Sequence, residues 1–210
     1  MKEKKVKERK NATAKDREKL TAKNFKKVSG PSVDAYNEMV QADYVKIIER
    51  AHQLSSIDKN DYSAPIMITV PDAFYRGGKV NYRLDKKMDE TFTLIYDQAL
   101  VYVLFFGEKS LFYYQANINH INGQIAADIA GEFNYSDVIH IETELKYDNN
   151  DKPKYLSLDL EIGLVNGTIV PFHLRNHRIH QDYKLSSFLT NQEQQILDIL
   201  KKKVRECHSN

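Results

Sequence analysis

Residues 139–174 carry the pattern that most constrains the fold, a regular alternation of apolar and polar side chains. One apolar series is Ile139, Ile141, Thr143, Leu145 and Tyr147, a second is Leu156, Leu158, Leu160 and Ile162, and a third is Val170, Phe172 and Leu174. Because successive side chains of a strand point to opposite faces, each series predicts a half-buried strand. A loop at 148–153 and a hairpin signal at Asn166-Gly167 separate them, so we expect a three-stranded antiparallel meander.

The polar partners of the first two series predict an acidic sheet face. One register places Glu142 opposite Asp159, and another places Glu142 opposite Glu161. Both registers gather the same side chains, which are His140, Glu142, Glu144, Asp159 and Glu161. This face could receive a basic partner, a divalent cation or the N-terminal segment, or it could be solvated with Lys146 as a partial neutraliser.

In the second hairpin, the expected turn would put the apolar side chains of the two strands on different faces of the sheet. A two-residue turn at Asn166-Gly167 would place Phe172 on the side of Glu161 rather than beside Leu160. We therefore expect a bulge near Gly163 that restores the common apolar face.

Further β signals precede the meander. Runs rich in β-branched and aromatic residues predict strands at 66–70, 92–96, 100–106 and 111–118, with turns at 107–109 and 119–123. After the strand at 66–70, β signals therefore dominate from residue 91 onward.

Two amphipathic helices flank the strands. A helix over about 33–55, with Ser32 as N-cap, is predicted by apolar residues at spacings of three and four, namely Tyr36, Val40, Tyr44, Ile47, Ala51 and Leu54. The sequence Thr190-Asn191-Gln192-Glu193 has capping-box spacing and precedes the apolar residues Ile196, Leu197, Leu200 and Val204. This second helix is expected to close the core of the sheet.

Charge is distributed unevenly along the chain. Residues 1–30 hold 12 Lys or Arg against 4 Asp or Glu, a net of +8, which leaves 19 against 25, a net of −6, in the rest. With so few apolar residues, 1–30 is expected to be a disordered tail that contacts an anionic partner. Its candidate contact residues are Lys2, Lys4, Lys5, Lys7, Arg9, Lys10, Lys15, Arg17, Lys19, Lys23, Lys26 and Lys27. A solubilising tail without a partner is the alternative, and resting contact with the acidic sheet face is expected when no partner is bound.

Cysteine content and hydropathy bear on the compartment. The single Cys207 allows no intramolecular disulfide, which fits a reducing cytoplasm. The charged start lacks the apolar segment of a secretion signal, and the apolar run at 98–107 is about half of the roughly 20 residues of a membrane-spanning helix. A cytoplasmic protein is expected, and the predominance of lysine over arginine is a bias found in bacteria of AT-rich genome.

The order of elements resembles the pleckstrin-homology-like (PH-like) superfold, including bacterial PH-like and GRAM-type domains. The resemblance covers about residues 66–206, and its most specific part is Tyr135-Ser136-Asp137-Val138-Ile139, an entry to a middle strand. It implies an α+β chain, with an antiparallel PH-like β-barrel or sandwich capped by a C-terminal helix. Such domains bind lipids, peptides or proteins through loops or an open edge. The first hairpins hold no Lys-x-Arg cluster of the phosphoinositide-binding kind.

No motif names a reaction or a cofactor. The chain has no Gly-rich phosphate loop, no Gly-x-Ser-x-Gly and no His-Glu-x-x-His, and Cys207 near a chain end is a poor nucleophile. The imidazoles of His173, His177 and His180 could surround zinc, but no paired Cys motif accompanies them. We expect neither a metal nor a cofactor, and these residues are read as a loop that faces solvent or an anionic ligand.

These expectations combine into one functional hypothesis. Residues 1–30 would be a basic tail, 31–60 an accessory helix and linker, and 61–210 a PH-like β domain with its C-terminal helix. The protein would be a non-catalytic binding or scaffolding module whose partner is a protein or an anionic membrane surface. The alternatives are a nucleic-acid-associated protein that uses the tail for non-specific contact and an enzyme of unrecognised type.

Overall fold

The computed structural model describes residues 13–30, 33–57, 62–71, 80–86, 92–149, 151–152, 155–178 and 189–209. Its helices are α1 (Ala14–Asn24), α2 (Asp34–Ser55) and α3 (Asn191–His208), with a short 3₁₀ turn at Tyr135–Asp137. Its strands are β1 (Ile66–Pro71), β2 (Tyr82–Lys86), β3 (Phe92–Tyr96), β4 (Gln98–Phe106), β5 (Ser110–Asn119), β6 (Gln124–Asn134), β7 (Val138–Tyr147), β8 (Tyr155–Leu164) and β9 (Ile169–Arg178). The expected α+β class and the C-terminal helix are both confirmed.

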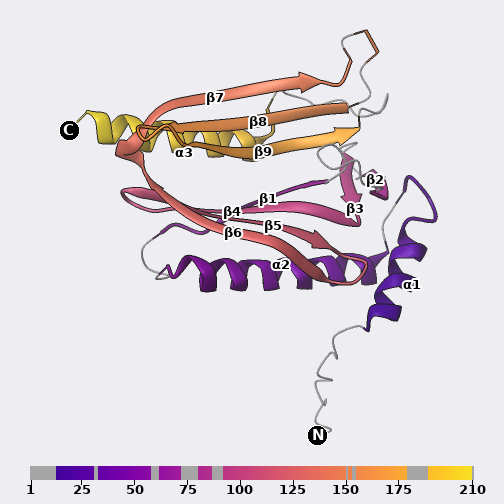
Figure 1. Cartoon of the computed structure of the whole chain (residues 1–210). Coiled ribbons are helices and arrows are strands. Elements are labelled where there is room, and N and C mark those ends of the chain that lie inside the picture. Colours follow the sequence, from indigo (N-terminus) through magenta and orange to yellow (C-terminus); the bar gives the residue numbers. More distant parts are fainter. Residues whose placement is uncertain are drawn as a thin grey trace, which may run out of the picture.

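The strands form three antiparallel sheets in the order β1-β4-β5-β6, β2-β3 and β7-β8-β9. The three-stranded sheet lies over one face of the four-stranded sheet, and α2 lies along the other face (Figure 1). At one side, β1 approaches β9, where Asn176 Nδ2 donates to the carbonyl of Pro71 at 3.3 Å. Within the described residues the sheets do not close into a barrel, so the barrel alternative is wrong for this part of the chain.

The central strand β4 is buried on both faces and separates two hydrophobic cores. Its even-numbered side chains, Leu100, Tyr102, Leu104 and Phe106, pack between the two large sheets with residues of β8, β9 and α3. Its odd-numbered side chains, Ala99, Val101, Val103 and Phe105, pack under α2. This explains why the sequence of β4 is a continuous apolar run without alternation.

The three-stranded meander forms where it was expected, with two differences in detail. In the β8–β9 connection three residues, 165–167, separate Leu164 from Thr168, whose carbonyl accepts from Leu164 N–H at 2.9 Å, and Gly167 has φ +82°. This longer loop, rather than a bulge at Gly163, puts Phe172 opposite Leu160. In β7 the register shifts at Ile139, which is 67% exposed instead of buried, and Thr143 and Tyr147 are exposed as well, so the expected inward face is wrong at these three positions.

Helix α3 agrees closely with expectation. Thr190 caps it with a complete capping box to Glu193, and Ile196, Leu197 and Leu200 are buried in the core between the sheets. A buried ion pair fixes its start, where Arg175 Nε on β9 donates to Glu193 Oε1 at 2.8 Å. The helix is therefore docked on the β domain at its N-terminal end.

Several expectations about the N-terminal half are corrected. Residues 14–24 are not disordered but form α1, whose N-cap Thr13 makes a capping box with Asp16. Helix α2 has Val33 at its N-cap position, and Ser32 lies outside the described residues. The buried face of α2 is turned toward Tyr36, Met39, Asp43, Ile47 and Ala51, while Leu54 is 50% exposed. Strands β2 and β6 were not predicted.

Candidate functional site

Helix α1 is fixed to the body by a buried ion pair. Arg17 Nη2 donates to Asp43 Oδ1 at 2.7 Å, and Arg17 Nη1 donates to Asp43 Oδ2 at 2.9 Å and to the His120 carbonyl at 3.1 Å. The guanidinium lies against the β5–β6 turn so closely that a Cβ on Gly123 would be 2.8 Å from Arg17 Cζ. This arrangement connects α1, α2 and the four-stranded sheet at one point.

The same carboxylate also holds a buried histidine. His120 Nδ1 lies 2.9 Å from Asp43 Oδ2, and neither side chain is exposed. Burial would raise the pKa of Asp43, but the hydrogen bonds and charges of His120 and Arg17 outweigh it and lower that pKa. His120 Nε2 is buried without a hydrogen-bond partner among the described residues, and the imidazole packs edge-to-face on Tyr44 with ring centroids 5.5 Å apart.

The chain after α1 is held by a second arginine. Arg83 on β2 donates to the carbonyls of Gly30 at 3.0 Å and Ser29 at 3.3 Å, and also to the carbonyl of Asn24. Asn24 Oδ1 in turn accepts from Val33 N–H at 2.9 Å. Residues 24–30 therefore have a defined course between α1 and α2.

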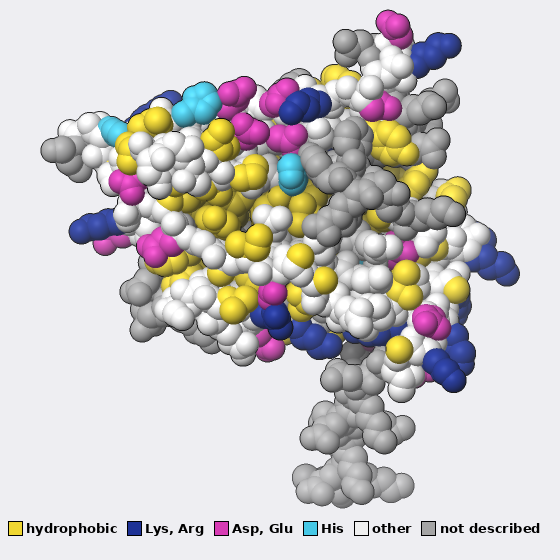
Figure 2. Space-filling view, viewed as in Figure 1, with side chains coloured by type: hydrophobic (Ala, Val, Ile, Leu, Met, Phe, Trp, Pro, Cys, Tyr) yellow, Lys and Arg dark blue, Asp and Glu magenta, His cyan; other side chains and the backbone are white. Residues whose placement is uncertain are grey.

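All five lysines of residues 14–30 point to solvent, whereas Arg17 points inward. We call Lys15, Lys19, Lys23, Lys26 and Lys27 the lysine face. The first three are four residues apart on α1 and therefore share one side of the helix. In Figure 2 dark blue side chains gather at the lower right, where Figure 1 places α1. The candidate residues Lys2, Lys4, Lys5, Lys7, Arg9 and Lys10 lie outside the described residues.

The acidic sheet face forms on the outer side of β7 and β8. Glu142 lies opposite Glu161, and Glu144 lies opposite Asp159, which is the second of the two registers considered. Figure 2 shows these magenta side chains as a band along the upper part of the molecule, interrupted by cyan and dark blue ones.

Much of this acidic charge is paired locally. His140 Nε2 lies 2.9 Å from Glu142 Oε2, and Lys146 Nζ lies 2.6 Å from Glu144 Oε2. Asp159 is only 8% exposed, and its Oδ1 lies 2.7 Å from His173 Nδ1. Because α1 docks beside α2, on the other side of the four-stranded sheet, residues 14–24 do not rest on this face as expected.

An apolar groove separates the start of β7 from the second half of α3. It has a volume of about 530 Å³ and is lined by Val138, Ile139, His140, Ile141, Lys201, Val204, Arg205 and His208. Strand β7 is an edge strand, since within the described residues it pairs only with β8. The groove thus combines an open strand edge with an apolar floor, and Lys201 and Arg205 are exposed at its rim.

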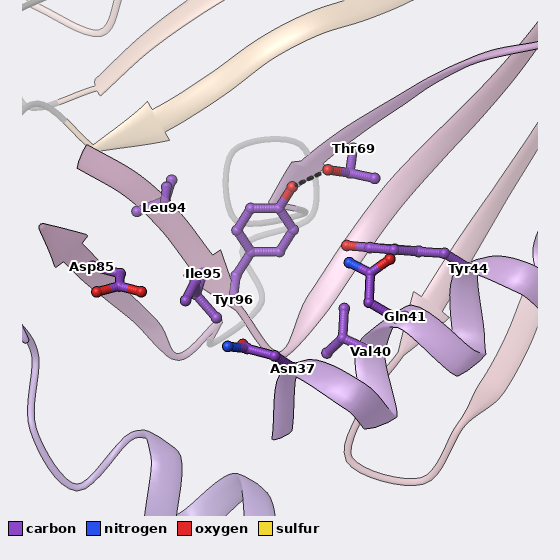
Figure 3. A pocket seen from close by; sticks show the side chains of 9 residues that line it. All are labelled: Asn37, Val40, Gln41, Tyr44, Thr69, Asp85, Leu94, Ile95 and Tyr96. Atoms are coloured by element: carbon purple, nitrogen blue, oxygen red, sulfur yellow. Dashed lines mark hydrogen bonds between the residues drawn. The ribbon is translucent and has the colours of Figure 1, made fainter. Parts of the chain in front are cut away.

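A separate cavity of about 410 Å³ lies between α2 and the β2–β3 hairpin. Figure 3 shows its lining residues, which are Asn37, Val40, Gln41, Tyr44, Thr69, Asp85, Leu94, Ile95 and Tyr96. They come from α2, β1, β2 and β3. The cavity lies next to the anchor of α1, because Tyr44 packs on His120.

The histidine-rich segment does not assemble into a metal site in the part of the chain that is described. His173 binds Asp159, the side chain of His177 is not described, and His180 lies outside the described residues. Among the described residues no three His, Cys, Asp or Glu side chains are grouped to hold a metal ion. None of the described helices is long and apolar enough to cross a membrane.

Sequence reasoning missed two features of these sites. The first is the Arg17–Asp43–His120 cluster, for which Asp43 carried a signal, since it lies one turn from both Met39 and Ile47 on the buried face of α2. The second is the cavity of Figure 3, which depends on the unpredicted hairpin partner β2 and has no local sequence signal.

The chain matches no known family model, no curated protein and no solved structure.

Proposed function

We propose that this protein is a non-catalytic binding and scaffolding module of the PH-like kind. The proposal is supported by a four-stranded sheet, β1-β4-β5-β6, followed along the chain by the three-stranded meander β7-β8-β9 and then by helix α3. The β2–β3 hairpin is inserted after the first strand of this series. Two surfaces are available for partners, and Figure 1 places them at opposite ends of the molecule.

The first surface is the lysine face, which binds an anionic partner. The observation that carries this proposal is that the cations of α1 differ in burial and role. Arg17 is buried as an anchor, while Lys15, Lys19 and Lys23 are exposed on a helix that this anchor holds in place. A positioned row of ammonium groups attracts phosphate groups without imposing geometry on them.

The partner presents phosphates rather than nucleobases. Base recognition on single strands uses exposed aromatic side chains for stacking, but Phe25 packs edge-to-face on Tyr36 at 5.3 Å. A lysine near an anionic lipid surface contributes about 1 kcal/mol, so five lysines with the six further cations of residues 1–12 suffice for reversible binding. An anionic membrane surface fits this chemistry best, and contact with nucleic acid backbones is the competing outcome.

The test compares two double variants that remove the same charge. Lys19→Gln/Lys23→Gln removes charge from the lysine face, and Lys109→Gln/Lys202→Gln removes it from exposed sites elsewhere. Sedimentation with phosphatidylserine vesicles is expected to weaken at least about fivefold for the first variant only, and to weaken further as salt rises. Equal behaviour of the two variants, or binding of duplex DNA but not of vesicles, would contradict a membrane partner.

Deletion of residues 1–12 completes this experiment. It removes six cations and leaves the Arg17 anchor in place, so the fold should persist while vesicle affinity falls. Deletion of residues 1–30 is less informative, because it also removes the buried Arg17 side chain.

A second candidate function is supported by the groove between β7 and α3. An extended segment can pair with an edge strand, here beyond Val138, whose carbonyl is bonded to His208 Nε2 at 3.1 Å, and the apolar floor at Val138, Ile139 and Ile141 can hold its alternate side chains. The groove has no carboxylate among its lining residues and carries Lys201 and Arg205. The occupant is therefore an extended protein segment with apolar residues next to an acidic one.

Selection from a displayed library of random peptides tests this second function. The expected consensus alternates apolar residues and contains Asp or Glu, and its binding should be lost in Ile139→Asp. Because Ile139 and Leu54 are both exposed, Leu54→Asp is a matched control that should keep binding. A consensus without acidic residues, or equal loss in both variants, would contradict the proposal.

A further inference from the structure

The cavity between α2 and the β2–β3 hairpin has the features of a small-molecule site. Its volume of about 410 Å³ lies within the usual range of ligand pockets, about 300–1,000 Å³. Polar groups of α2, β1 and β3, at Gln41, Tyr44, Thr69 and Tyr96, lie close together, whereas Asp85 of β2 lies at the far end of the lining, beyond Ile95 (Figure 3). Convergence of this kind, on a partly apolar wall, is what orients a bound molecule.

Two hydrogen bonds of Tyr96, one at its hydroxyl and one at its backbone carbonyl, hold the wall of the cavity in place. The hydroxyl of Tyr96 donates to Thr69 Oγ1 at 2.7 Å, and its carbonyl accepts from the Tyr36 hydroxyl at 2.9 Å. Tyr96 is only 8% exposed and packs in the core under α2. The polar groups of the cavity are therefore preorganised before any ligand arrives.

The hydroxyl groups in the cavity are neutral donors and acceptors. Burial raises the pKa of Tyr44 to about 12, although a hydrogen bond with Thr69 opposes the rise. Burial also raises the pKa of Tyr96 well above its ordinary value. Both phenols therefore keep their protons at neutral pH, and Tyr44, Thr69 and Tyr96 together provide three hydroxyls within one small space.

The described lining of the cavity offers no positive charge to an anion. Asp85 is the one ionisable carboxylate among the described lining residues, and no Lys, Arg or His belongs to them. A phosphate or carboxylate ligand would lose its hydration without gaining a counter-charge. The amide of Gln41 and the hydroxyls instead match a molecule that carries many hydroxyl groups, and the ring of Tyr44 and the aliphatic side chains can cover its C–H faces.

We propose that this cavity binds a small neutral polyol of monosaccharide size, with Gln41, Tyr44 and Thr69 as its hydrogen-bonding residues. The site is independent of the lysine face and of the groove between β7 and α3. Its ligand lies beside α2 and the β2–β3 hairpin, and Tyr44 connects it with the buried His120.

Titrations followed by ¹H–¹⁵N NMR test this site in the full-length protein. The probes are myo-inositol, glucose and N-acetylglucosamine, each added up to about 10 mM, which covers affinities down to the millimolar range. We expect saturable shifts for at least one of them at the amides of α2 residues 37–44, Thr69 and β3 residues 94–96. Absence of shifts with all three polyols overturns the proposal, as do equal shifts with inorganic phosphate or spermidine.

Two single variants then test whether the Tyr44 hydroxyl contacts the polyol. Tyr44→Phe keeps the ring on His120 and removes one hydroxyl, so the affinity for the active polyol should fall about three- to tenfold. Tyr147→Phe, on the exposed end of β7, removes a hydroxyl remote from the cavity and should leave that affinity unchanged. An unchanged affinity in Tyr44→Phe, with the rest of the spectrum preserved, would show that the polyol binds elsewhere.

Discussion

Arg17 of α1 and Asp43 of α2 form a two-pronged ion pair in which the side chains are 8% and 0% exposed. A buried pair of this geometry needs both partners, because either charge left alone in the interior loses its hydration without compensation. The pair therefore makes a segment with almost no apolar surface into an ordered part of the protein.

Replacing Arg17 with alanine should reveal the strength of this anchor. Asp43 would keep only His120 as a partner, and the free energy of unfolding should fall by about 3–5 kcal/mol, as for other broken buried pairs. Chemical denaturation measures this loss. Lys19→Ala, on the exposed side of the same helix, should change stability by no more than about 0.5 kcal/mol. A similar loss in both variants would mean that the helix is not held by this pair.

Acid should weaken the same anchor. Since the pKa of Asp43 is lowered in the folded state, its stabilisation is fully present above the ordinary carboxyl pKa of about 4 and is lost as pH falls through the lowered pKa. Asp43→Asn should therefore be less stable than the wild type at neutral pH, and the difference should shrink toward about pH 2. Denaturation curves across this range give the answer, and a pH-independent difference would contradict it.

Truncation of Leu200 should open the core between the two large sheets. Leu200 is 1% exposed and packs with residues of both sheets, so Leu200→Ala should cost about 2–5 kcal/mol. Lys202→Ala, two residues on and largely exposed, is the matched control. A loss below about 0.5 kcal/mol for Leu200→Ala would show that α3 is not docked in solution.

Removing the charge of Asp159 and removing that of Glu142, both on the acidic sheet face, should change the free energy of unfolding by different amounts. Asp159 is almost buried and bound to His173, so Asp159→Asn should lower the free energy of unfolding by about 1–3 kcal/mol. The Glu142 side chain is 55% exposed, and Glu142→Gln should stay within about 0.5 kcal/mol of the wild type. Thermal unfolding monitored by circular dichroism can distinguish them, and equal effects would rule out a structural role for Asp159.

The meander and α3 could be predicted from sequence because their signals are local. The alternation in β8 and β9 and the capping box at Thr190 are each complete within about ten residues, and the inward side chains follow from them. The burial of Ser157 and Asp159 on the other side of β8 does not follow from this alternation. Strand β6 was missed because alanine and glycine weaken its apolar alternation and Phe133 is its one buried side chain. Strand β2 has a similar difficulty, since its order depends on pairing with β3 and on the reach of Arg83 to residues 24–30.

The order of α1 could not be predicted, because it comes from a contact between distant residues. Composition alone indicates that 1–30 cannot bury enough apolar surface to be ordered. In the structure, the partners of Arg17 are 26 and 103 residues away in the sequence, at Asp43 and His120. A single charged residue in a basic segment gives no local sign of such partners. The cavity of Figure 3 likewise has no local signal in the sequence.

The double burial of β4 also has a consequence for how the molecule unfolds. Alternate side chains of this one strand belong to the core between the sheets and to the core under α2. Neither core can melt while the other keeps β4 fully packed, since each of residues 99–106 takes part in one of them. The helix α2 and the β domain, which look like separate parts along the sequence, therefore form one cooperative unit and should lose their structure in a single transition.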